Sequence, residues 1–131
     1  MKPRCIPMVL MLAVAGCSYS YPVEAVFING KLHFQAEEKL NGCLSNFSVE
    51  SEAGEVVWAI DGEFRGSPCE DNFPLAYGVV PRGMTTLSPA KPLKAGVLYK
   101  VRGSDGDHYY GAFRYRRTLV ITNTPEIARA P

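Results

Sequence analysis

Turn residues divide most of this chain into short segments in which apolar and other residues alternate. Between residues 23 and 122, some seven or eight such segments follow one another at intervals of about ten residues, with Gly, Pro, Asn and Asp between them. A repeat of two residues is typical of strands with one buried face, and regularly spaced short strands are typical of antiparallel sandwiches and barrels. The sequence therefore predicts an all-β fold.

The clearest local signal is a hairpin near the start of this region. The segment Val23–Gly30 ends in Asn29-Gly30, the dipeptide that best fits a two-residue hairpin turn, and Lys31–Gln35 would pair back with Leu32 and Phe34 on one face. Further strands are predicted at 47–51, 55–62, 75–81, 97–103, 108–117 and 118–122, with a loop at 82–92.

One motif narrows the choice of architecture. The segment Leu93–Val101, "LKAGVLYKV", resembles the L-x-P-G-x-x-Y-x-V segment of fibronectin type III domains, with Ala95 in place of the usual Pro. In those domains the hydroxyl of the matching tyrosine, Tyr99 here, forms a hydrogen bond back to the backbone in a tyrosine corner. The resemblance implies an antiparallel immunoglobulin-like sandwich; a small closed β-barrel is the alternative.

The first sixteen residues differ from the rest. Lys2 and Arg4 precede an apolar run, Ile6–Ala15, and small residues follow it. This order is typical of a secretory signal peptide, and the run is about half of the ~20 residues that a membrane-spanning helix needs.

The end of that run, "LAVAGC", resembles the lipobox of bacterial lipoproteins. The resemblance implies cleavage before Cys17 and attachment of lipid chains, palmitate among them, to that cysteine. Two or three chains are enough for stable membrane anchoring. Ser18, in place of an acidic residue, implies the outer membrane, facing the periplasm. Alternatively, Ala13-Val14-Ala15 is an A-x-A site that would release a soluble periplasmic or secreted protein.

These features predict the organisation of the chain: a signal peptide at 1–16, a tether at 17–22, a β domain at 23–122 and a tail at 123–131. Of the four cysteines, Cys5 leaves with the signal peptide and Cys17 carries lipid. Cys43 and Cys69 remain, and in an oxidising compartment they are expected to form a disulfide. The loop between them suggests a stabilisation of about 3–4 kcal/mol.

Charge and motifs favour neither nucleic acid nor catalysis. Loss of Lys2 and Arg4 from 14 basic residues leaves 12 against 13 acidic ones, so no overall positive field attracts nucleic acid. His33 and His108 lie outside any catalytic signature, and Asp105 and Asp107 fit a tight turn better than a calcium site. We therefore predict no enzyme, no cofactor and no metal site.

The least ordinary stretch is His108–Arg117, "HYYGAFRYRR". As a strand it would place Tyr109, Gly111, Phe113 and Tyr115 on a core face. The opposite face is either a binding surface or an ordinary solvated sheet face, and the candidate binding residues are Arg102, Tyr110, Arg114 and Arg116.

Together these predictions describe a lipid-anchored envelope protein that acts as a binding or structural module. Its expected partners are the membrane, through the lipid, and another envelope protein or a glycan. The alternative is an inhibitor or immunity-type lipoprotein that blocks an envelope-attacking enzyme with a projecting loop, at 63–74 or 82–92.

Overall fold

The computed structural model describes residues 20–36, 44–62, 73–105, 107–116 and 121–124. These residues form strands and connecting turns, and none of them belongs to a helix long and apolar enough to span a membrane. The strands are β1 (Ser20–Ile28), β2 (Lys31–Ala36), β3 (Asn46–Ser51), β4 (Val56–Gly62), β5 (Leu75–Ala76), β6 (Met84–Ser88), β7 (Leu98–Ser104), β8 (His108–Tyr115) and β9 (Ile121–Asn123).

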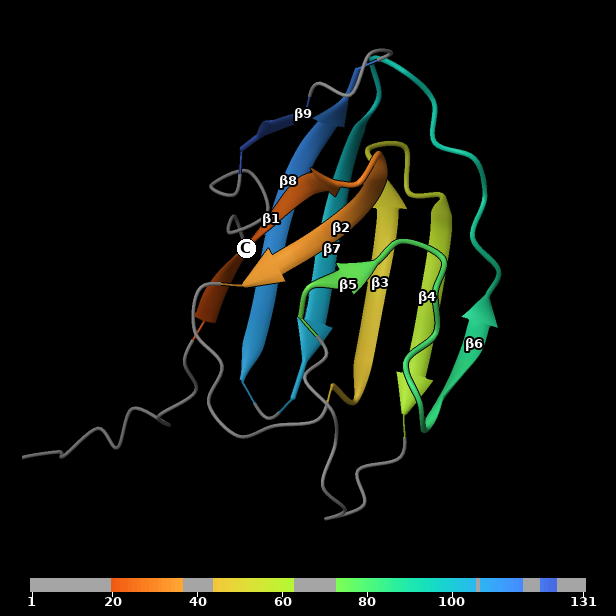
Figure 1. The fold of residues 1–131 in the computed structure, drawn as a ribbon. Coiled ribbons are helices and arrows are strands. Elements are labelled where there is room, and N and C mark those ends of the chain that lie inside the picture. Colours follow the sequence, from red (N-terminus) through yellow and green to blue (C-terminus); the bar gives the residue numbers. More distant parts are fainter. Residues whose placement is uncertain (1–19, 37–43, 63–72, 106, 117–120, 125–131) are drawn as a thin grey trace, which may run out of the picture.

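All nine strands belong to one sheet, in the order β5-β2-β1-β8-β7-β3-β4-β6, with β9 also paired to β8. Every pairing is antiparallel except that of β1 with β8, which is parallel and runs from Ser20 opposite His108 to Pro22 opposite Tyr110. Beyond Pro22, β1 pairs with β2 instead. The sheet curls there, so that β2 and β5 cross over the face made by β7 and β3, giving a half-barrel (Figure 1).

The predicted all-β class is confirmed, whereas the finer architecture differs from the prediction. A two-sheet antiparallel sandwich is expected from the sequence, and the structure has one curled mixed sheet. The closed-barrel alternative differs too, because β5 and β6 stand at opposite ends of the strand order. The physical reason lies in β1, which pairs with β8 through its first residues and with β2 through the rest, and so joins the two layers.

The close crossing of β1 over β8 depends on Gly111. A Cβ atom at this position would lie 2.5 Å from the carbonyl oxygen of Val23 and 3.4 Å from its Cβ. Real side chains do not tolerate such a contact with backbone, so only glycine allows the two strands to approach this closely. Gly111 thus permits the bend that closes the half-barrel over its core.

The core is a continuous group of aromatic side chains between the two layers. Phe34 on β2 lies 5.2 Å from Phe47 and 5.7 Å from Phe113, measured between ring centroids, and Phe47 lies 5.8 Å from Trp58. All four rings are at most 1 % exposed. Tilted and edge-on ring pairs at these distances add stabilisation to that of apolar burial.

Two local predictions are confirmed. Asn29 and Gly30 have φ angles of 50° and 75°, as a two-residue hairpin turn between β1 and β2 requires. On β8, Tyr109 and Phe113 are 2 % and 1 % exposed, so the face predicted to be buried does face the core.

Several boundaries differ from those expected, and β9 ends at Asn123, the first residue of the predicted tail 123–131. β1 begins at Ser20, within the predicted tether 17–22. The strand expected at 75–81 ends after Ala76, because the chain turns at Gly78, whose φ is +80°. The loop expected at 82–92 contains β6, an edge strand whose three central side chains are exposed and therefore show no alternation in the sequence.

A side-chain amide closes the gap between β1 and β9. Asn123 Oδ1 accepts a hydrogen bond from the backbone N–H of Ala25 at 2.8 Å, and Asn123 Nδ2 donates to the Ala25 carbonyl at 3.0 Å. Ala25 is only 3 % exposed. The amide of Asn123 thus supplies the two bonds that a neighbouring strand would otherwise make.

Replacement of Asn123 by Ala should therefore destabilise the domain. Both polar groups of Ala25 would be left without partners, at a cost of about 1–3 kcal/mol. Urea denaturation of Asn123→Ala measures this loss, with Thr122→Ala, an exposed neighbour on β9, as the matched control. Equal stability of the two variants would contradict the role given to Asn123.

Candidate functional site

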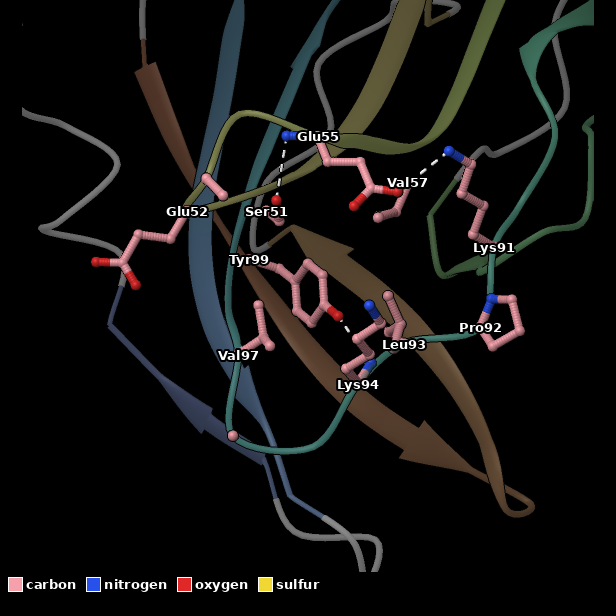
Figure 2. A pocket seen from close by; sticks show the side chains of 12 residues that line it. Ser51, Glu52, Glu55, Val57, Lys91, Pro92, Leu93, Lys94, Val97 and Tyr99 are labelled. Carbon is pink, nitrogen blue, oxygen red and sulfur yellow. Dashed lines mark hydrogen bonds and ion pairs between the residues drawn. The ribbon is translucent and has the colours of Figure 1, made fainter.

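A pocket of about 760 Å³ opens at the end of the half-barrel where the β3–β4 turn meets the segment before β7. Figure 2 shows Tyr99 at its centre, between the turn and the segment. Its lining comes from two stretches of chain, Ser51, Glu52, Ala53, Glu55 and Val57 on one side, and Lys91, Pro92, Leu93, Lys94, Gly96, Val97 and Tyr99 on the other.

The β3–β4 turn is closed by Ser51. Its backbone N–H donates to the Glu55 carbonyl at 2.7 Å, and its hydroxyl accepts the Glu55 N–H at 3.1 Å. Gly54, with a φ of +90°, completes the reversal. The next residue after Ser51, Glu52, donates its N–H to the Leu98 carbonyl at 2.9 Å, which joins the turn to β7.

The segment 91–97 is held against the sheet at both ends. At its start, the Lys91 N–H donates to the Val57 carbonyl at 2.8 Å. At its end, the Gly96 N–H donates to the Tyr115 carbonyl at 2.8 Å, and the Arg114 guanidinium donates to the Gly96 carbonyl at 2.7 Å. These bonds fix one wall of the pocket.

Between these ends, the predicted tyrosine corner is present. The Tyr99 hydroxyl accepts the backbone N–H of Lys94 at 2.7 Å, five residues back in the chain. The hydrogen bond that the sequence motif predicts is therefore present, although the fold around it is a half-barrel and not the expected sandwich. Here it positions the wall of a pocket.

The Tyr77 hydroxyl also supports this wall. It lies 2.5 Å from the Lys91 carbonyl and 3.2 Å from the Val57 carbonyl, and it donates to the nearer of the two. Burial, and secondarily the neighbouring Tyr99, raises the pKa of Tyr77 to about 12.

The pocket combines an apolar floor with a charged rim. Val57 and Tyr99 are 4 % and 2 % exposed, and Leu93 and Val97 are half-buried beside them. On the rim, the Lys91 ammonium pairs with Glu55 at 3.1 Å. An apolar cavity with a few polar groups at its edge is the usual form of a small-molecule site.

The candidate face predicted on β7 and β8 is only partly assembled. Arg102 and Tyr110 are direct cross-strand neighbours, and Arg102 is exposed. Arg114 lies farther along β8, where its guanidinium is bonded to the Gly96 carbonyl, and Arg116 follows the end of the strand. The structure thus brings Arg102 and Tyr110 together. Arg114 is engaged in a hydrogen bond to the backbone, and Arg116 lies beyond the end of β8.

The same face is partly packed. Leu98 and Ala112 are 6 % and 1 % exposed, and Tyr110 packs against them. Whether the face binds a partner stays a prediction.

The two histidines lie on different strands and away from the pocket. His33 on β2 bonds through Nδ1 to the Lys31 carbonyl, and His108 pairs with Ser104 and Ser20. Asp105 accepts the Asp107 N–H and the Tyr109 hydroxyl, as a turn residue would. Among the described residues, no group of three or more His, Cys, Asp or Glu side chains could hold a metal ion.

Cys17, Cys43 and Cys69 lie outside the described residues, as do Ser18 and the signal-peptide region. Lipidation and the disulfide therefore stay predictions.

Sequence reasoning missed the pocket. Its two walls are far apart in the chain, and only the pairing of β3 with both β4 and β7 brings them to one end of the sheet. The available signals were the tyrosine-corner motif and Gly54, which mark the two walls separately.

The chain matches no protein-family model, no curated protein and no solved structure.

The pKa of Tyr77 predicts a loss of stability in alkaline solution. Because the unfolded tyrosine titrates near pH 10 and the folded one near 12, the contribution of Tyr77 to the free energy of unfolding should be constant below about pH 10 and fall as the pH rises through that interval. Tyr77→Phe should lower the free energy of unfolding at pH 8 by about 1 kcal/mol. Between about pH 10 and 12, the variant should lose less stability than the wild-type protein does. Urea denaturation across this range measures both effects.

The matched control is Tyr110→Phe, on the outer face of the sheet. If Tyr77→Phe and the control lose stability equally between about pH 10 and 12, the pKa of Tyr77 is the same in the folded and the unfolded protein. That result would contradict the prediction.

Proposed function

We propose that this protein is a lipid-anchored binding module of the bacterial envelope, and that the pocket beside Tyr99 is its binding site. The observation that carries the proposal is the position of the pocket at the opposite end of the sheet from Ser20. Ser20 pairs with His108, beside the β7–β8 turn, whereas the pocket surrounds the start of β7. In Figure 1 the β7–β8 turn lies at the bottom and the β3–β4 turn at the top.

The distances suit an anchored protein. Cys17 precedes Ser20 by three residues, so the attachment point of a lipid would lie within about 10 Å of the start of β1. From Leu98 to Ser104, β7 spans about 20 Å. A domain fastened through Cys17 can therefore present the pocket away from the membrane surface.

The chemistry of the lining favours binding over catalysis. None of the described lining residues is a histidine or a cysteine. The Ser51 hydroxyl accepts a bond from the Glu55 backbone, and the Glu55 carboxylate is paired with Lys91, so the serine faces no base. A nucleophile needs an adjacent base, and the described lining contains no such pair.

The alternative, an inhibitor with a projecting loop, gains no support from the described residues. Of the two candidate loops, 82–92 contains β6, which is paired with β4, and most of 63–74 lies outside the described residues.

Lipidation is tested at Cys17. Mass spectrometry of protein extracted from membranes should find an acylated N-terminal Cys17. Cys17→Ala should move the protein from the membrane fraction to the soluble fraction, because the lipid supplies the anchor. Ser18→Ala is the control and should stay with the outer membrane. Wild-type protein that is soluble and begins at Gly16 would refute the anchor.

The predicted disulfide has its own test. In protein isolated from the envelope, neither Cys43 nor Cys69 should react with a thiol reagent before reduction, and a peptide containing both should appear on non-reducing digestion. Cys43→Ser with Cys69→Ser should lower the stability by about 3–4 kcal/mol. Two free thiols in the native protein would contradict the pairing.

A further inference from the structure

The pocket lining carries two glutamates and two lysines, and one ion pair joins two of the four. Glu55 and Lys91 neutralise each other across 3.1 Å. Of the two remaining charged residues, the Glu52 side chain points away from Tyr99 and from the other lining residues (Figure 2). Lys94 is exposed and has no ion pair among the described residues, and its backbone is fixed at the wall by Tyr99. Of the two charges outside the ion pair, the one on the wall that Tyr99 fixes is therefore positive.

Tyr99 adds an unused hydrogen-bond donor. Its oxygen accepts the Lys94 N–H, but its own O–H has no acceptor among the described residues, and the side chain is 2 % exposed. A hydroxyl can donate one hydrogen bond and accept others, so an oxygen of a ligand in the pocket could accept the Tyr99 O–H. The donor and the ammonium belong to neighbouring parts of one wall, so one head group could meet both.

The floor is suited to an apolar chain. Val57, Leu93, Val97 and the Tyr99 ring supply an apolar lining, and about 760 Å³ lies within the range of small-molecule sites. Each buried methylene contributes about 0.8 kcal/mol. The described lining contains no guanidinium that could bind an anion in bidentate fashion, so a point charge and a hydroxyl are the recognition groups that it offers.

We propose that the pocket binds an amphiphile with an acyl or alkyl chain and an anionic oxygen head group. The chain would lie on the apolar floor, and the head group would meet the Lys94 ammonium and the Tyr99 hydroxyl. The inference rests on the proposed function, since it names the ligand class of the same pocket. A fatty acid and a phosphate-headed lipid share this chemistry.

The test uses four probes that share a twelve-carbon chain, each below its micelle concentration: dodecanoate, dodecyl phosphate, dodecanol and dodecyltrimethylammonium. Binding to the otherwise intact Cys17→Ala chain is measured by calorimetry. NMR shifts of the Glu52, Lys94 and Val97 amides report whether the probe occupies the pocket. The two anionic probes should bind at least about tenfold more tightly than the cationic one, and the comparison between them distinguishes a carboxylate from a phosphate source.

Three variants make the result specific. Lys94→Glu should lower the affinity for dodecanoate at least about tenfold and remove the preference for anions, while its backbone N–H still bonds to Tyr99. Val97→Asp should weaken every probe, because it places a charge on the apolar floor. Lys31→Glu, at an exposed position of β2 outside the pocket, should change nothing.

The outcomes separate the two proposals. Equal or tighter binding of the cationic or neutral probe, with pocket shifts, would overturn the anionic head group and leave the pocket as a binding site. An affinity of Lys94→Glu for dodecanoate equal to that of the parent protein would also overturn the anionic head group. If no probe shifts the pocket amides, both the ligand class and the proposed function of the pocket fail.

Discussion

The close crossing of β1 over β8 at Gly111 is the constraint on which the rest of the structure depends. With the Val23 carbonyl 2.5 Å from where a Cβ would stand, β1 can leave β8 and carry β2 across the sheet. The Phe34 ring then reaches Phe47 and Phe113, and the aromatic core becomes continuous. A side chain at Gly111 would force β1 away from β8 at this point. A single missing side chain thus allows the core to close.

The pocket end is organised by hydrogen bonds between side chains and backbone instead of by strand pairing. Tyr77, Tyr99 and Arg114 each bond to a backbone group of the segment 91–97, at Lys91, Lys94 and Gly96. The backbone of an irregular segment needs such partners when it lies against a core. Since these side chains hold the wall from the sheet side, the wall keeps its shape while the exposed Lys94 side chain can meet solvent or a ligand.

The sequence predicted what depends on neighbouring residues and missed what depends on pairing between distant ones. The Asn29-Gly30 turn, the buried face of β8 and the Tyr99 corner are each determined within ten residues, and all three occur. Three other features depend on partners elsewhere in the chain: the parallel pairing of Ser20 with His108, the hydrogen bonds of the Asn123 amide to Ala25, and the edge strand β6. The pocket belongs to the second group, because its walls meet only through the two pairings of β3.

The same distinction explains why the two halves of the proposed function arise from different kinds of observation. An anchor is a local chemical feature, so the short motif ending in Cys17 can predict it. A binding site of this type is a property of the fold, made from residues that are individually ordinary: a valine, a leucine, a tyrosine and a lysine. What makes Lys94 noteworthy is that Glu55 is already paired with Lys91 and that Tyr99 fixes the Lys94 backbone beside the apolar floor. An ammonium with no ion pair among the described residues, on a wall beside apolar surface, favours a ligand that offers both an anion and a hydrocarbon, since either part alone would leave half of the site unused.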